Sequence, residues 1–255
     1  MENALLIGLS RQMALTRELE AVANNIANLN TTGFKADGTV FEEFLMPVAR
    51  DNQFSARDSR VSFVRDRATW HDLGQGTVQQ TGNPLDVAID GDAFLAVQTA
   101  RGERYTRNGA FQINVNGELV TSEGDRVLGE GGPIQFQSTD NSISIGKDGT
   151  IRVREGSSAT IDSARGKLRL VSFERPRQLQ KDGGSRFLAP PGLEPRPAER
   201  ATVTQGAVEK SNVRAVIEMT RMIEITRTYT QVAQMLQQQS EMRRSAIEKL
   251  GAVPV

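Results

Sequence analysis

The C-terminal stretch constrains the fold most, because from about residue 211 to 249 it carries apolar repeats without a glycine or proline before Gly251. One stripe steps by three and four residues, as an α-helix requires. Ser211 or Asn212 can cap the start of this helix. The first stripe is Met222, Ile225, Tyr229, Val232 and Leu236, and the neighbouring stripe is Val216, Met219, Ile223, Thr226, Thr230 and Ala233.

The N-terminal stretch, about residues 3–29, has the same helical period. Gly33 supplies an expected helix stop, because glycine accepts the left-handed backbone found just past a helix end. Neither helix buries its face alone, and most helical stability comes from such burial. The stripes are Leu6, Leu9, Met13 and Thr16, with Leu15, Leu19, Val22, Ile26 and Leu29 beside them.

Between these stretches the apolar period changes to two, which predicts strands. Asn116-Gly117 predicts a hairpin with a type I′ turn, and Asp148-Gly149 predicts a second hairpin. Residues 176–197 hold five of the nine prolines and predict an irregular return linker. The expected strands are Phe94–Thr99, Arg104–Thr106, Phe111–Val115, Ile143–Ile145, Ile151–Val153 and Lys167–Phe173.

Two similar five-residue stretches flank the β-rich region and indicate how the chain enters and leaves it. Gln75-Gly76-Thr77-Val78-Gln79 precedes the β-rich region and Gln205-Gly206-Ala207-Val208-Glu209 follows it. We expect these two stretches to run side by side.

The resulting prediction is an α+β fold, with terminal helices packing as a coiled-coil-like stem and a central all-β domain. The helices pair within one molecule, or with neighbouring subunits, and spacing alone leaves both open. The expected segments are an assembly helix at 1–33, an extended linker at 34–74, a β-rich domain at 75–175, a Pro-rich return linker with a closing strand at 176–210, and a second assembly helix at 211–255.

Composition argues against several functions. Thirty-one basic and 31 acidic residues leave no basic excess for nucleic acid. With no cysteine and His71 as the only histidine, we expect no catalytic residues, cofactor or metal. Asp86, Asp90 and Asp92 form the nearest approach to a carboxylate pair, but their context is typical of a strand and turn.

We expect neither direct membrane insertion nor a cleaved signal peptide. No stretch approaches the ~20 apolar residues that span a bilayer. Charged residues such as Arg11, Arg17 and Glu20 interrupt the N-terminal segment, whereas a signal peptide has a clean apolar run.

Four motifs, in order, resemble those of flagellar rod and hook proteins. They are Ala23–Asn28 with Thr31–Lys35, then Thr81–Ile89, then Tyr105–Phe111 running on to Gly117–Thr121, and finally Ser211–Val213 with Glu218–Ile223. The opening Met1–Leu9 and the length resemble the proximal rod group most, with the distal rod group as a rival. The chain departs from the family pattern at Thr226-Arg227 and Ser240–Met242.

The resemblance implies a structural subunit of the flagellar basal-body rod in the periplasmic space. It implies passage through the flagellar type III export apparatus, and terminal helices that fold on polymerising into an inner tube with copies of the chain and other rod proteins. Short amides are costly inside a helix, so Asn24, Asn25 and Asn28 indicate either a frayed, solvated helix end or hydrogen bonds across subunits, and the resemblance favours the second. The expected interface is Leu6, Leu9, Met13, Leu19, Val22, Asn24, Asn25, Ile26, Asn28, Val213, Ile217, Met222, Ile225, Tyr229, Val232 and Leu236.

Other interpretations remain at this stage. Phe34 and Lys35 are as readily an ordinary apolar anchor and a solvated charge as functional residues. The chain could also be a distal rod or hook-type paralogue, a cell-envelope carbohydrate-acting protein, or a soluble adaptor whose helices pair only with each other.

Overall fold

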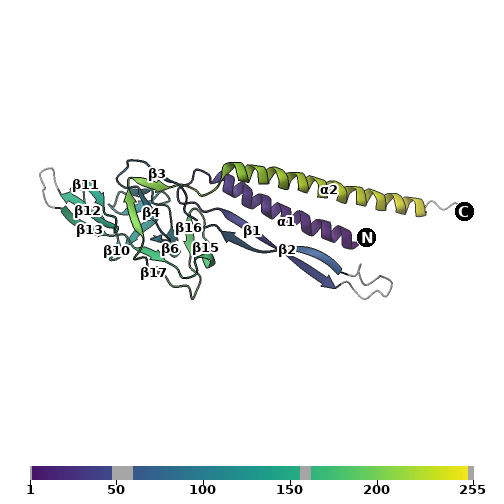
Figure 1. The fold of residues 1–255 in the computed structure, drawn as a ribbon, viewed down its shortest axis with the longest axis horizontal. Coiled ribbons are helices and arrows are strands. Elements are labelled where there is room, and N and C mark those ends of the chain that lie inside the picture. The colour runs from purple at the N-terminus through teal and green to yellow at the C-terminus, as the bar shows by residue number, and fades with distance from the viewer. Residues whose placement is uncertain (1, 48–59, 156–161, 252–255) are drawn as a thin grey trace. The chain divides into compact units, whose positions relative to one another are not determined.

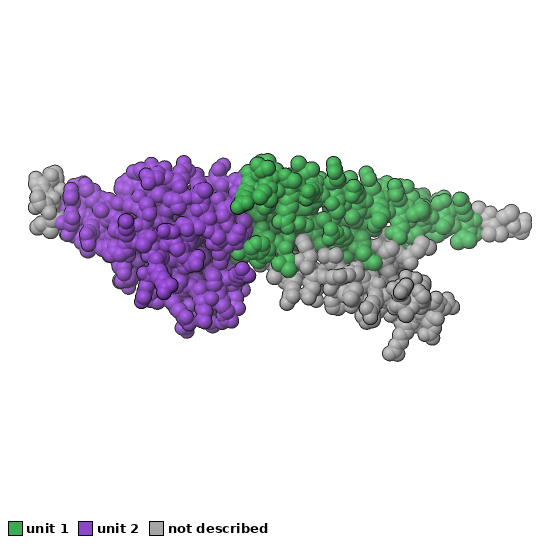
Figure 2. Space-filling view, in the orientation of Figure 1, with its two compact units in different colours: residues 1–27, 37–71, 214–255 green, residues 28–36, 72–213 purple. Residues whose placement is uncertain are grey.

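A computed structural model describes residues 2–47, 60–155 and 162–251, and the side chains of 7–40, 70–155 and 162–251. Helix α1 (Glu2–Ala27) and helix α2 (Ala215–Gly251) flank a β-rich middle, which confirms the predicted α+β class. The chain divides into two compact units, shown in green and purple in Figure 2. Unit 1 comprises residues 1–27, 37–71 and 214–255, and unit 2 comprises 28–36 and 72–213.

Unit 1 contains both helices and a long β-hairpin (Figure 1). Strands β1 (Asp37–Pro47) and β2 (Arg60–His71) pair antiparallel, from Asp37 opposite His71 to Pro47 opposite Arg60. A bulge between Val40 and Phe41 shifts their register. This hairpin occupies most of the segment 34–74, where an extended linker was expected.

The helices pack on each other through a small apolar cluster inside unit 1. Leu15, Val22 and Ile225 are buried in it, and Leu19, Ile26 and Val232 pack against it half-buried. Helix α1 also contacts both hairpin strands. Within the described residues, no helix has the length and apolar character needed to cross a membrane.

The helix ends differ in detail from expectation. Helix α1 ends at Ala27, so Gly33 is not its stop. Gly33 adopts φ +67°, and a Cβ there would lie 2.3 Å from the backbone nitrogen of Asn108, so the position requires glycine. Helix α2 starts at Ala215, and the Ser211 hydroxyl accepts the Val213 N–H ahead of it.

Unit 2 is built from short strands grouped into several sheets (Figure 1). The largest runs β15-β16-β6-β5-β9-β8-β7 with β10, β14 and β17 at its sides, β11, β12 and β13 form a second, and β18-β4 and β19-β3 form two pairs. The strands are β3 (Val78–Gln80), β4 (Val87–Asp90), β5 (Phe94–Thr99), β6 (Gly102–Thr106), β7 (Phe111–Ile113), β8 (Leu119–Thr121), β9 (Arg126–Gly129), β10 (Gly132–Pro133), β11 (Asp140–Ile145), β12 (Thr150–Glu155), β13 (Asp162–Lys167), β14 (Leu170–Ser172), β15 (Gln180–Lys181), β16 (Arg186–Leu188), β17 (Arg196–Pro197), β18 (Thr202–Gln205) and β19 (Ala207–Glu209), with a 3-10 turn η1 (Pro176–Gln178).

Two apolar clusters stabilise this unit. One gathers residues from β4, β5, β7 and β12, among them the fully buried Val87 and Leu95. The other is aromatic: the Phe94 ring lies edge-on to Phe173 and Phe187, at centroid distances of 6.0 and 5.7 Å. Such edge-to-face pairs are favourable because a positive ring edge meets a negative ring face.

Both predicted hairpins form, with one correction. Strands β7 and β8 pair across the Asn116-Gly117 turn, and β11 and β12 pair across Asp148-Gly149. The type I′ assignment is wrong, because Gly117 has positive φ and Asn116 does not. The Asn114 side chain instead organises this loop by accepting the N–H groups of Asn116 and Glu118.

The closing contact predicted from the two similar five-residue stretches is confirmed. Strand β19 pairs antiparallel with β3, placing Glu209 opposite Val78 and Val208 opposite Gln79. The single strand expected over 167–173 is instead divided, because β13 ends at Lys167 to pair with β12 while β14 begins at Leu170 to pair with β5.

Candidate assembly surface

Most of the large apolar side chains of α2, and three on α1, are exposed. Among the described side chains of α2, Ile225 alone is buried. A soluble helix ordinarily hides one apolar stripe against its own domain, so a long exposed stripe marks an interaction surface. The exposed large apolar residues are Ile7, Leu9 and Met13 on α1, and Val216, Ile217, Met219, Met222, Ile223, Tyr229, Met235, Met242, Ile247 and Leu250 on α2.

The structure divides the expected interface residues into three groups by their burial. Val22 and Ile225 are buried between the helices of one chain, and Leu19, Ile26 and Val232 pack against them, so this stripe is covered intramolecularly. Val213, Leu236 and Asn28 are half-buried. The exposed members are Leu9, Met13, Asn24, Ile217, Met222 and Tyr229, while the side chain of Leu6 lies outside the described residues.

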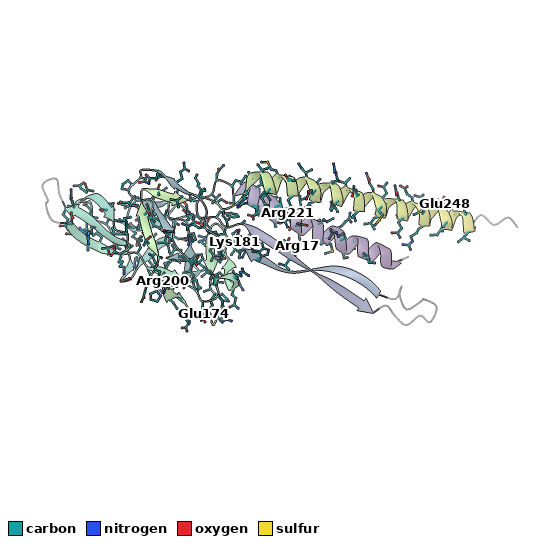
Figure 3. All side chains as sticks on the ribbon, in the orientation of Figure 1. Arg17, Glu174, Lys181, Arg200, Arg221 and Glu248 are labelled. Carbon is teal, nitrogen blue, oxygen red and sulfur yellow. The ribbon has the colours of Figure 1, made fainter. Side chains whose placement is uncertain are left out.

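Close approach of the helices depends on one small residue. A Cβ built on Gly8 would lie 2.4 Å from Cδ2 of Leu236, so Gly8 of α1 lets the Leu236 side chain pack directly on the backbone. Further along the pair, the Arg221 guanidinium on α2 donates to the Glu18 carboxylate on α1 at 2.9 Å (Arg221 is labelled in Figure 3). A partly exposed pair of this kind adds little stability.

Asn25 is buried and forms its hydrogen bonds within its own chain. Its Nδ2 donates to the Asp37 carbonyl at 2.8 Å, and the Asp37 N–H donates to its Oδ1 at 2.8 Å. Nδ2 also lies 3.3 Å from Oε2 of Glu218 on α2. The expectation that Asn25 bonds across subunits therefore does not describe this amide, whose oxygen and nitrogen already have partners.

Asp37 continues the same polar network into the hairpin. Its Oδ1 lies 2.7 Å from Nδ1 of His71, the residue opposite it in the β1–β2 register. Glu218, Asn25, Asp37 and His71 thus connect α2, α1, β1 and β2. The network belongs wholly to unit 1.

Unit 2 contains a buried ion cluster that the sequence analysis missed. The Lys35 ammonium lies 2.5 Å from Oε1 of Glu209, and the Arg107 guanidinium donates to Oε2 at 2.8 Å. The side chains of Lys35 and Glu209 are both 0% exposed, which excludes a solvated Lys35. Burial lowers the pKa of the Lys35 ammonium, and Glu209 opposes that shift. Removing one member of such a cluster leaves a buried charge without its partner.

This cluster joins distant parts of the sequence. Lys35 also donates to the Gly74 carbonyl, and Arg107 donates to the Gly91 and Ala93 carbonyls. The Gly33 N–H donates to the Glu209 carbonyl at 2.8 Å. The segment that follows α1 is therefore fixed to the strand that precedes α2, inside unit 2.

The described residues show no group of His, Cys, Asp or Glu arranged to hold a metal ion. Asp86, the most buried of the three carboxylates singled out from the sequence, accepts hydrogen bonds from Thr81 at 2.6 Å and Asn83 at 3.0 Å. These bonds organise the loop that leads into β4.

Comparison with known proteins identifies the family. The model of the flagella basal body rod protein family matches residues 5–35, that of the flagellar hook protein FlgE/F/G D1 domain matches 88–153, and that of the flagellar basal body rod FlgEFG protein C-terminal region matches 204–249. The flagellar basal-body rod protein FlgF of Caulobacter vibrioides is 41% identical over 254 residues, covering 99% of this chain and 100% of the relative. The chain belongs to the flagellar basal-body rod protein family.

Other relatives agree with this assignment. FlgF of Mesorhizobium japonicum is 36% identical and covers 99% of each chain, and FlgG of Bacillus subtilis is 30% identical over 88% of this chain and 89% of its own length. The rod protein family is structural and is not a family of enzymes. Two of its matched regions, 5–35 and 204–249, include most of the residues of α1 and α2 that expose apolar side chains.

Proposed function

We propose that this rod protein polymerises through the outer faces of α1 and α2 into the axial tube of the flagellar basal body, which serves as its drive shaft. The observation that carries the proposal is how little of α2 is buried within its own chain. One of its described side chains is buried by its own chain, whereas apolar residues from Val216 to Leu250 face outward. Burying those residues against other subunits would supply the stabilisation that a long helix otherwise lacks.

The two apolar stripes would have different partners. The stripe with Leu15, Val22 and Ile225 holds α1 to α2 within one chain. The neighbouring stripe of α2, which contains the exposed Met219 and Ile223, is the outer stripe. It remains available for neighbouring copies and for other rod proteins. A pair of joined helices offers a larger docking surface than a single helix does.

The finer parts of the proposal follow from the family resemblance. The chain would pass unfolded through the flagellar type III export apparatus and assemble in the periplasmic space. The exposed, weakly buried helix α2 supports ordering on assembly, because coupled folding and binding suits a segment with little core of its own. Asn24 and Asn28 would contribute polar contacts between subunits.

A distal rod paralogue is the second candidate. FlgG relatives match at 30–32% identity over more than four fifths of the chain. The FlgF relatives match at 34–41% over 98–99%, which favours the proximal position.

The test is incorporation into basal bodies. We expect Met219→Lys with Ile223→Lys to abolish incorporation, because two ammonium groups would enter an apolar contact. Gln231→Lys, at an exposed position on the same helix outside both stripes, is the matched control. Circular dichroism of the purified chains would establish that the β sheets of unit 2 remain folded. Normal incorporation of the double variant would overturn the proposal.

A further inference from the structure

Strands β3 and β7 are among the edge strands of unit 2. Strand β3 pairs with β19 on one side, and within the described residues no strand pairs with its other side. Strand β7 ends the strand order of the largest sheet, where it pairs with β8. An edge strand presents unpaired N–H and C=O groups, and these can pair with a strand from another chain.

Neither edge carries the charges that ordinarily discourage such pairing. Residues 73–85, which include β3, contain no Asp, Glu, Lys or Arg, and neither do residues 108–117, which include β7. Across the whole chain 24% of residues are charged. Natural edges are commonly blocked by lysine or proline within the strand, and β3 and β7 contain neither.

The exposed apolar side chains of unit 2 lie on these same two edges. In the described part of that unit, the large apolar residues that face solvent are Val78 on β3, Ile113 on β7 and Val115 just after it. Val115 is fully exposed, at 102%. Each of these two edges therefore presents an apolar side chain that a partner strand could cover.

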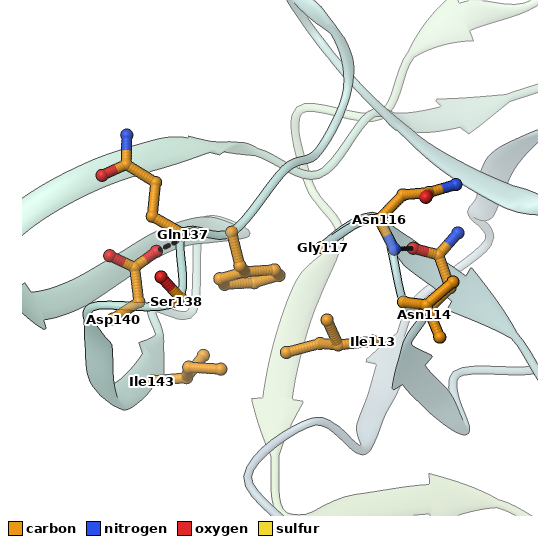
Figure 4. A pocket seen from close by; sticks show the side chains of 10 residues that line it. Ile113, Asn114, Asn116, Gly117, Gln137, Ser138, Asp140 and Ile143 are labelled. Atoms are coloured by element: carbon orange, nitrogen blue, oxygen red, sulfur yellow. Dashed lines mark hydrogen bonds between the residues drawn. The ribbon is translucent and has the colours of Figure 1, made fainter.

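A hollow of about 430 Å³ adjoins β7. Ile113 and Ile143 lie on opposite sides of it, with Phe136 also in its wall (Figure 4). Its one charged lining residue, Asp140, is hydrogen-bonded to the Arg165 guanidinium, so the hollow presents apolar and amide groups. An uncharged segment with a protruding apolar side chain fits a hollow of this kind.

We propose that, between neighbouring copies of this chain, the β3 edge of one copy pairs with the β7 edge of the next, with Val78 beside the hollow. The two edges differ, so each copy offers one of each, and the contact repeats without closing as a symmetric dimer would. The inference rests on the proposed polymerisation and adds a second contact to it, made by the β sheets.

Disulfide formation tests this pairing, because the chain contains no cysteine of its own. Val78→Cys and Ile113→Cys would be produced together in cells that lack the natural gene, and basal bodies would be isolated and oxidised. Residues opposite each other in paired strands have Cβ atoms about 4.5–5.5 Å apart, near the range that a disulfide bridges. We expect a cross-linked dimer from the mixture and none from either variant alone.

The outcomes separate the two proposals. If the chain is present in basal bodies but the mixture gives no dimer, or one variant alone gives it, the edge pairing is overturned and the rod function stands. If the natural chain is absent from basal bodies, the rod function fails and the pairing fails with it.

Charged substitutions give an independent measurement. Gln79→Lys on β3 and Gln112→Lys on β7 place an ammonium group on each edge, and each should reduce incorporation. Gln98→Lys is the matched control, because Gln98 is exposed on β5, which is paired on both sides with β6 and β9. Equal incorporation of all three variants would also overturn the pairing.

Discussion

Asn25 and Asp37 hold each other through two reciprocal hydrogen bonds, both 2.8 Å long, in which the asparagine side chain pairs with the aspartate backbone. The amide thus takes the place of a neighbouring strand at the first residue of β1. Because Asn25 lies on α1, the start of the hairpin is fixed to the helix, and Glu218 extends the link to α2. The network explains how a costly helix residue stabilises unit 1.

Replacing Asn25 with leucine should detach the start of the hairpin from α1. Both backbone groups of Asp37 would lose their partner, and an unsatisfied buried polar group costs about 1–3 kcal/mol. We expect faster hydrogen exchange at the Asp37 amide, with the amides of β5 in unit 2 unchanged. Asn30→Leu, at an exposed position, is the control. Unchanged exchange at Asp37 would show that the pair is dispensable.

The buried ion cluster predicts an asymmetry between two single substitutions. Glu209→Gln leaves Lys35 and Arg107 buried without their carboxylate, a type of change that costs about 3–5 kcal/mol. Lys35→Met leaves Glu209 paired with Arg107 and should cost less. Thermal unfolding followed by circular dichroism measures both. An equal fall in melting temperature for the two variants would mean that Arg107 does not neutralise the Glu209 charge when Lys35 is replaced.

Acid should weaken unit 2 in part through Asp140. The hydrogen-bonded Arg165 guanidinium lowers the pKa of the Asp140 carboxyl group below its usual value. The unfolded chain, with a carboxyl pKa of about 3.9, therefore takes up this proton first. The stabilisation is complete above about pH 3.9 and is lost as the pH falls through the folded-state pKa. Melting temperatures of the natural chain and Asp140→Asn should differ near neutral pH and converge in acid.

The helices, strands β5, β6 and β7, and the positions of two hairpin turns could be predicted because each depends on local pattern, whereas the β1–β2 hairpin was not predicted. The heptad run from Met222 to Leu236 and the glycines at 117 and 149 carry their signals within a few residues. Even the β3–β19 contact had a local signal, since two similar stretches flank the β-rich region.

What could not be predicted depends on residues that meet only after folding. Lys35 and Glu209 are 174 positions apart, and nothing near either indicates that its charge is buried. The division of the apolar stripes was equally hidden. Period shows that Ile225 and Met222 lie near one face, but packing decides that Ile225 is buried by α1 while Met222 stays 40% exposed. The sequence predicted an interface on the stripe from Met222 to Leu236, so contact through the outer stripe is a proposal made from the structure.

The contact of Gly8 on α1 with Leu236 on α2 gives a final test, in which a second substitution should correct the first. Gly8→Val places a branched side chain where Cδ2 of Leu236 lies 2.4 Å from a Cβ, and overpacking of this kind typically costs about 1–3 kcal/mol. Leu236→Ala alone removes packing and should weaken the pair as well. Together they should cost less than the sum, because the alanine vacates the space that the valine needs. Helical circular dichroism during thermal unfolding measures all three variants, and strictly additive losses would mean that the two side chains do not meet.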